Sequence, residues 1–199
     1  MKDDLAPARP YVYAGFLVLA GVLGWFFAFQ LTLDKFAVLT DPDAQLSCNI
    51  SVVVSCGKNL ASWQGALFGF PNPLIGLAAW VAPVVVGLAL LAGAKFDRWF
   101  RIAFNVGVLG AIALVVFLVY TSIFVLGTLC IWCMLTWVVT IPLFWLVTLN
   151  NLRDGTIPVA PRAREFFARL YEWVPALTIA CYLIIGVLAQ VRLDALNSL

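Results

Sequence analysis

The sequence predicts an all-α integral membrane protein: a four-helix bundle, a fifth transmembrane helix, and a short amphipathic helix in the loop after the first span. Of its 199 residues, 64% are hydrophobic and only 11% are charged, whereas a soluble domain is about half apolar and about a quarter charged. Five apolar stretches are also long enough to cross a bilayer, which takes about 20 residues. The predicted spans are 11–33, 73–94, 102–127, 129–149 and 173–191.

The composition also narrows the classes of function. The chain contains no histidine, which excludes histidine-ligated haem, most zinc hydrolase sites and histidine-based acid–base catalysis. There is no basic run interleaved with aromatic residues, so no nucleic-acid partner is expected. The predicted spans contain no Asp, Glu, Lys or Arg, which argues against an ion pump or a proton-coupled carrier.

The distribution of basic residues predicts the orientation of the spans. Nine Lys and Arg residues lie in segments 1–10, 95–101 and 150–169, against three in the alternate segments. Because cytoplasmic loops carry the excess of basic residues, the N-terminus is expected inside and the C-terminus outside. The loop 34–72 and the tight turn 127–128 then face out. Residues 1–10 form a cytoplasmic N-terminal segment, and the first span is interpreted as an anchor rather than a removed signal peptide.

Four of the five cysteines form two local pairs on the side predicted to face out. Cys48 and Cys56 lie in the outer loop, and Cys130 and Cys133 lie at the outer end of the fourth span. On a helix, the spacing of the second pair puts both sulfurs on one face, close enough to form a disulfide. At a helix N-terminus the helix dipole favours the thiolate, which is the nucleophile of disulfide exchange. The fifth cysteine, Cys181, is interpreted as a small buried apolar residue.

Two thiol pairs at one membrane face predict an electron relay. The outer pair would meet a soluble protein dithiol, and the inner pair would pass electrons to an acceptor in the lipid; one cysteine of each must come within bonding distance. Because the chain has no nucleotide-binding glycine motif, haem attachment motif or flavin fingerprint, a lipid-soluble quinone is the expected acceptor. Aromatic residues are the candidate walls of a quinone pocket beside Cys133: Trp63, Phe68, Trp132 and Trp137.

The outer loop is expected to contain a short amphipathic helix on or in the outer leaflet. After Cys56, apolar residues recur at helical spacing: Leu60, Trp63, Leu67 and Phe68. Ser55 is the expected N-cap residue. This helix either forms a lid that covers Cys130 and Cys133 and shields an apolar ligand, or serves as a simple interfacial anchor.

These motifs together resemble the vitamin K epoxide reductase (VKOR) family, and specifically its bacterial homologues. The pattern is Cys48-x7-Cys56, then Ser62-Trp63-x5-Gly69-Phe70-Pro71, then Cys130-Ile131-Trp132-Cys133, in this order and topology. The resemblance covers roughly residues 11–149, which are expected to form the four-helix catalytic bundle with the outer loop 34–72. Residues 150–169 are interpreted as a cytoplasmic linker, and residues 170–199 as the fifth transmembrane helix with an outer C-terminus.

The resemblance implies a role for each paired cysteine. Cys48 would exchange with a redox partner, Cys56 would pass electrons to Cys130, and Cys133 would face the quinone and reduce it. Because the chain stops soon after the fifth span, the partner is expected to be a separate thioredoxin-fold, DsbA-like protein.

Two further positions follow from the resemblance. Ser62 matches a serine that lies near the cysteines in relatives, and the resemblance implies that it is one of the quinone-binding residues, with Trp63, Phe68 and Trp137. Vertebrate members have a tyrosine four residues after the last cysteine, where this chain has Trp137. An indole N–H donates a hydrogen bond but is not a proton-transfer acid, so reduction of a quinone is expected rather than reduction of an epoxide.

The predicted function is therefore a thiol:quinone oxidoreductase of a bacterial plasma membrane that supports disulfide formation in exported proteins. The quinone would be menaquinone or ubiquinone, and no metal, flavin or haem is expected. Two alternatives remain open. The four paired thiols could bind zinc, or the protein could be a carrier or channel with two static disulfides.

Overall fold

The computed structural model describes residues 10–41, 46, 48–49, 51 and 53–194. Residues 1–9 of the predicted N-terminal segment and the last five residues of the predicted outer C-terminus lie outside the described residues. The helices are α1 (Pro10–Thr40), α2 (Cys56–Ala61), the 3₁₀ helix η1 (Trp63–Ala66), α3 (Asn72–Ala79), α4 (Val81–Leu91), α5 (Arg98–Tyr120), the π-helical turn η2 (Thr121–Leu126), α6 (Ile131–Arg153), α7 (Pro161–Glu172) and α8 (Val174–Leu193).

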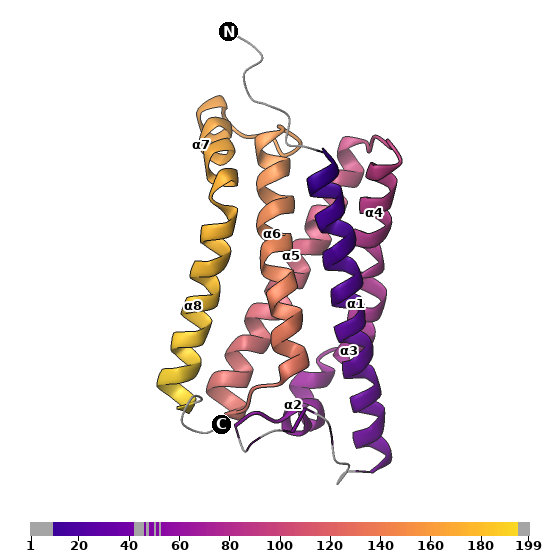
Figure 1. Cartoon of the computed structure of the whole chain (residues 1–199), viewed down its shortest axis with the longest axis vertical. Coiled ribbons are helices and arrows are strands. Elements are labelled where there is room, and N and C mark those ends of the chain that lie inside the picture. The colour runs from indigo at the N-terminus through magenta and orange to yellow at the C-terminus, as the bar shows by residue number, and fades with distance from the viewer. Residues whose placement is uncertain (1–9, 42–45, 47, 50, 52, 195–199) are drawn as a thin grey trace.

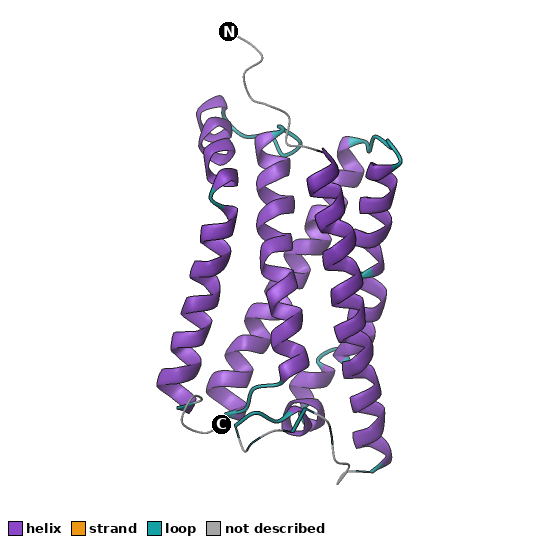
Figure 2. Cartoon of the chain, in the orientation of Figure 1, coloured by secondary structure: helices purple, strands orange, loops and turns teal. Residues whose placement is uncertain are grey.

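Five helical segments are long and apolar enough to cross a membrane, which confirms the predicted all-α membrane fold. They are Tyr11–Thr40, Asn72–Leu91, Arg98–Leu126, Ile131–Arg153 and Val174–Leu193. Figure 1 shows the first four side by side as a bundle, with α8 along one side, next to α6. Among the described residues the chain forms no strand longer than a single bridge, and the loops gather at the two ends of the bundle (Figure 2).

The bundle core forms where α1, α4, α5 and α6 meet. Its buried apolar residues include Leu17, Trp80, Val108 and Val147. Glycine allows α1 and α4 to approach closely, because a Cβ added at Gly21 would lie 2.8 Å from the backbone nitrogen of Val84. Small residues at helix contacts are the usual way in which membrane helices pack.

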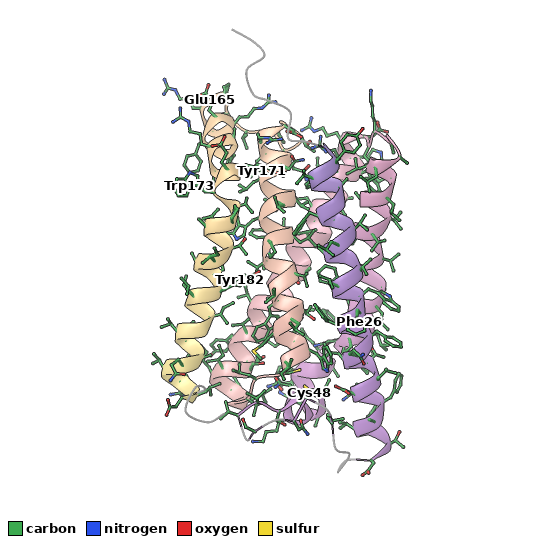
Figure 3. The ribbon with its side chains drawn as sticks, viewed as in Figure 1. Phe26, Cys48, Glu165, Tyr171, Trp173 and Tyr182 are labelled. Carbon is green, nitrogen blue, oxygen red and sulfur yellow. A yellow bond between two sulfur atoms is a disulfide. The ribbon has the colours of Figure 1, made fainter. Side chains whose placement is uncertain are left out.

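The fifth span is attached to the bundle where α6 lacks one of its own hydrogen bonds. Pro142 lies inside α6 and has no backbone N–H to donate to the carbonyl of Val138. The hydroxyl of Tyr182 on α8 donates to that carbonyl at 2.6 Å, and Figure 3 shows Tyr182 between α8 and α6. A side chain of one helix therefore satisfies the acceptor that a proline left open in another.

The segment interpreted as a linker, residues 150–169, is more ordered than that interpretation implies. Helix α6 continues to Arg153, and α7 begins at Pro161, a residue whose fixed φ suits the first helical position. The side of α7 that is less exposed carries Ala163, Phe167 and Leu170, at the spacing of an amphipathic helix. The Arg153 guanidinium lies 4.5 Å above the ring of Tyr171, which further connects α7 to α6.

The two ends of the bundle differ in composition. The start of α1, the α4–α5 turn and the α6–α7 connection lie at one end, and α2 and the last residues of α8 lie at the other (Figure 1). We call the first the basic end, defined by Arg98, Arg101, Arg153 and Arg164. We call the second the cysteine end, defined by the two cysteine pairs.

Candidate active site

The structure brings the two cysteine pairs together in one cluster. Cys48 and Cys56 form a disulfide, whereas Cys130 and Cys133 are free thiols. The Sγ atoms of Cys56 and Cys130 are 3.1 Å apart. Both of these residues are 0% exposed, and they pack in an apolar cluster that includes Leu31 and Leu60. Sulfurs at this separation are in position for thiol–disulfide exchange.

A short backbone pairing sets the register of the two pairs. The N–H of Ser55 donates to the carbonyl of Leu129 at 2.9 Å, and the N–H of Leu129 donates to the carbonyl of Val53 at 2.7 Å. Cys56 and Cys130 immediately follow Ser55 and Leu129, so this parallel bridge places the two sulfurs side by side. The sequence analysis did not predict the bridge; its only local signal is the run of valines 52–54, typical of a strand.

The first helical turn of the outer loop is capped differently from the prediction. Ser55 occupies the N-cap position but makes no capping bond; its hydroxyl donates instead to Asn49 Oδ1 at 3.0 Å. The same oxygen accepts from the backbone N–H of Cys56 at 3.0 Å. Asn49 therefore supplies the cap, because its side chain reaches back from within the disulfide-closed loop.

Two charged residues lie beside the outer pair. Helix α1 continues past the predicted end at Leu33 to Thr40, so Asp34 and Lys35 belong to the helix and not to the loop. The carboxylate of Asp34 lies 3.3 Å from Cys48 Sγ. Lys35 is buried, and its ammonium group donates to the carbonyl of Leu60 in the last turn of α2, where helix carbonyls lack partners.

The group of Asp34, Cys48 and Cys56 also bears on the zinc hypothesis. One ligand atom from each of these residues lies within 4.8 Å of the others. With the two sulfurs joined in a disulfide, however, neither offers the thiolate that zinc requires. Zinc binding by both pairs would therefore need the outer pair in its reduced form.

The inner pair lies at the start of α6, as its sequence position predicted. Cys130 is the N-cap residue, and its Sγ accepts the backbone N–H of Cys133 at 3.4 Å. This hydrogen bond holds the Cys130 sulfur at the positive end of the α6 dipole.

Asn59 on α2 fixes the outer loop to the turn before Cys130. Its Nδ2 donates to Thr128 Oγ1 at 3.0 Å, and its Oδ1 accepts from the Ser122 hydroxyl at 2.9 Å. Ser122 lies in η2, a π-helical turn of the kind often found at functional sites. The turn predicted at 127–128 is present, with Gly127 in the left-handed region at φ +66°. Sequence reasoning missed the role of Asn59.

A cavity of about 600 Å³ opens beside the inner pair, a size typical of small-molecule sites. Its lining includes Cys133 and three of the residues predicted for the quinone pocket: Ser62, Phe68 and Trp137. Phe68 is 61% exposed, which places it at the rim, whereas Trp137 is 3% exposed.

The other two predicted wall residues lie elsewhere. Trp63 is 67% exposed, and its ring centroid lies 6.5 Å from that of Phe117. Trp132 packs edge-on against Phe26 of α1. The predicted helix is broken at Ser62, whose backbone is extended at ψ 157°; this break directs Trp63 outward and the next residue, Gln64, into the cavity.

Comparison with known families agrees with this geometry. Residues 16–148 match the profile of the Vitamin K epoxide reductase family, a stretch that runs from α1 to the last turns of α6 and contains both cysteine pairs. A search of curated proteins gave no match. The family is one of membrane oxidoreductases linked to quinones. Since the match covers about two thirds of the chain, this multi-pass membrane protein belongs to the vitamin K epoxide reductase family.

Proposed function

We propose that the protein oxidises the dithiol of a separate thioredoxin-fold, DsbA-like protein and reduces a lipid quinone, menaquinone or ubiquinone. The electrons pass through Cys48 and Cys56 and then through Cys130 and Cys133. The observation that carries the proposal is the 3.1 Å separation of the Cys56 and Cys130 sulfurs while Cys56 is in a disulfide with Cys48. The cysteine end would face the outside of a bacterial plasma membrane, with the N-terminus in the cytoplasm.

The first step is exchange between the partner and the outer pair. A partner thiolate attacks Cys48 Sγ, and Cys56 leaves as a thiolate; the partner's second thiol then displaces Cys48. The partner becomes a disulfide, and Cys48 and Cys56 become a dithiol. Cys48 is only 2% exposed while it is in the disulfide with Cys56, so docking of the partner has to uncover its sulfur. The Asp34 carboxylate is placed to accept a hydrogen bond from the Cys48 thiol that results.

The second step moves the electrons to the inner pair. The Cys56 thiolate attacks Cys130 of a Cys130–Cys133 disulfide, and Cys133 leaves. Cys48 then attacks Cys56, which restores the outer disulfide and frees Cys130. The arrangement in the structure, with the outer pair closed and Cys130 and Cys133 free, corresponds to the state after this transfer.

The third step reduces the quinone. The Cys130–Cys133 dithiol gives up two electrons and two protons and closes to a disulfide, and the quinone becomes a quinol. The cavity that Cys133 lines has the size and apolar character that a quinone ring needs. Trp137 in its wall offers an N–H donor but no acid, which favours a quinone over an epoxide as the substrate.

The test is quinone reduction by purified protein in detergent, followed by absorbance, with a reduced thioredoxin-fold protein as the donor. Wild-type protein is expected to turn over, and Cys133→Ala to show no turnover above background. Cys48→Ala should lose activity with the protein donor and keep activity with a small dithiol, which can reach the inner pair directly.

Quinone turnover by Cys133→Ala would contradict the relay. Zinc in stoichiometric amount in the purified protein would then favour the metal site. Both pairs remaining disulfide-bonded throughout incubation with donor and quinone would favour a carrier with static disulfides.

A further inference from the structure

Gln64 is a buried polar residue whose side-chain oxygen has no hydrogen-bond partner among the described residues. It lies in η1 and is 6% exposed. Its Oε1 atom is fully buried. Its backbone carbonyl, by contrast, accepts from Asn72 Nδ2 at 2.7 Å, so the main chain at this position is held in place. Burial of an unpaired amide is costly, and such groups in native structures generally have a missing partner.

Gln64 lines the same cavity as Cys133. The other amide and hydroxyl side chains in that lining are engaged within the protein. The donors and acceptors already paired belong to Asn59, Ser62, Asn72, Thr121, Ser122, Thr136 and Thr140. Within the part of the chain that the structure describes, Gln64 is therefore the amide of this lining that is left to meet a ligand.

The chemistry of an amide fits a ligand that changes between two redox forms. A quinone presents carbonyl oxygens, which only accept, and a quinol presents hydroxyl groups, which also donate. An amide offers both an N–H donor and a C=O acceptor. Its last torsion has two broad minima, so a half-turn exchanges the two atoms. The amide N–H can thus donate to a quinone carbonyl, and the Oε1 atom that has no partner in the structure can accept from a quinol hydroxyl.

We propose that Gln64 hydrogen-bonds one oxygen of the bound quinone and holds the ring in the cavity against the wall that contains Cys133. The identity of the ligand rests on the function proposed above. The amide then determines specificity, because it favours a ring with a polar oxygen at that end over a purely apolar ring of the same shape.

The test is ligand binding in the redox-inactive Cys133→Ala background. Detergent-solubilised protein is titrated calorimetrically with 2-methyl-1,4-naphthoquinone and with 2-methylnaphthalene, which has the same fused rings without the oxygens. Gln64→Met, close in size and without the amide, is expected to raise the Kd of the quinone about five- to tenfold. The Kd of the hydrocarbon should stay the same or fall, because the unpaired amide is gone.

Gln30→Met is the matched control. Gln30 lies on α1 at intermediate exposure and is not part of the cavity lining, so neither Kd should change. If Gln64→Met does not fold, Gln64→Asn retracts the amide by one methylene, and the same selective loss of quinone affinity is expected.

Three results would overturn the inference. An equal rise in the Kd of both ligands in Gln64→Met would mean that Gln64 only shapes the cavity. No change in either Kd would mean that it does not touch the ligand. No quinone binding by protein that retains Gln64 would mean that the cavity does not hold a quinone. These failures are distinguishable from failure of the relay. If the protein binds quinone selectively but wild type shows no turnover, the relay is rejected and the role of Gln64 stands. If wild type turns over but Gln64→Met changes neither Kd, the relay stands and the role of Gln64 is rejected.

Discussion

The two ends of the bundle use amide side chains for different purposes. At the basic end, Asn151 Nδ2 donates to Asn105 Oδ1 at 3.0 Å and joins α6 to α5. At the cysteine end, Asn59 joins the short helix α2 to Thr128 and to Ser122. The first bond connects two long helices that also pack against each other. The second connects the outer loop to the turn before Cys130. It therefore supports the short distance between the sulfurs of Cys56 and Cys130 in addition to stabilising the fold.

Charged residues follow the same division. The two ion pairs found among the described residues, Arg101–Asp154 at 3.0 Å and Arg153–Asp154 at 3.3 Å, lie at the basic end. Such exposed pairs contribute little to stability. At the cysteine end, Asp34 lies against Cys48 and Lys35 donates to α2. Polar groups therefore position the loop that carries the outer cysteine pair at the cysteine end, whereas at the basic end they connect the long helices.

The largest effect is expected from Asn59→Leu. This change removes the bonds to Thr128 and Ser122, so the backbone bridge of Ser55 and Leu129 has to hold the outer pair beside Cys130 without this support. Misplacement of reacting groups by about 1 Å can cost about a hundredfold in rate, and we expect a loss of that order in kcat with the protein donor. Lys58→Leu, an exposed position on the same helix, is the control. An unchanged kcat for Asn59→Leu would mean that the backbone bridge alone is enough to place α2 beside Cys130.

A smaller effect is expected from Asp34→Asn. The amide keeps the shape of the carboxyl group but loses the charge 3.3 Å from Cys48 Sγ. Charge-assisted hydrogen bonds are about twice as strong as neutral ones, so the amide stabilises the reduced Cys48 thiol less than the carboxylate does, and we expect the equilibrium constant for oxidation of the partner to fall roughly tenfold. Measurement of partner oxidation at equilibrium tests this. Quinone reduction driven by a small dithiol should not change; a matching loss there would place Asp34 in the inner transfer.

The sequence could predict the features of the fold and the site that depend on patterns within a short stretch of the chain. Hydropathy alone locates the spans. The predicted fourth span begins at Leu129, which places Cys130 and Cys133 at the start of α6. The register of Ser55 with Leu129 depends on a pairing between residues 74 positions apart, which no local pattern records. For this reason the contact between Cys56 and Cys130 could be expected only from family resemblance.

The differences from the sequence-based expectation at single residues have a common physical cause. A continuous helix after Cys56 would have turned Trp63 toward the cavity, but Ser62 caps a second, separate turn: its hydroxyl accepts the N–H of Gly65 at 3.3 Å. The break rotates the following residues, so Gln64 replaces Trp63 in the lining. Ser55 does occupy the predicted N-cap position, but Asn49 supplies the capping hydrogen bond, since a side chain brought near by loop closure competes with the adjacent one.

At the basic end, Asn151→Leu is expected to change stability without changing catalysis. The substitution removes a buried hydrogen bond and leaves Asn105 Oδ1 without its donor, which costs roughly 1–3 kcal/mol. Thermal unfolding in detergent should show a lower Tm, and quinone turnover per folded molecule should equal that of wild type. A loss of turnover comparable to that of Asn59→Leu would mean that the two ends are coupled.

The smallest effect is expected from Cys181→Ser. This substitution allows Cys181 to be compared with Cys133, a second free thiol on the same apolar cluster. Cys181 packs at the edge of the cluster of Val115, Trp137 and Ile141 and is not part of the cavity lining. Cys133 touches the same cluster but also lines the cavity and lies next to Cys130. The two thiols thus share apolar surroundings and differ in access to a redox partner. Turnover of Cys181→Ser should stay within about twofold of wild type, since a free cysteine in a core acts as a small apolar residue. A loss as severe as that of Cys133→Ala would show that packing against Trp137, and not the position beside Cys130, controls activity.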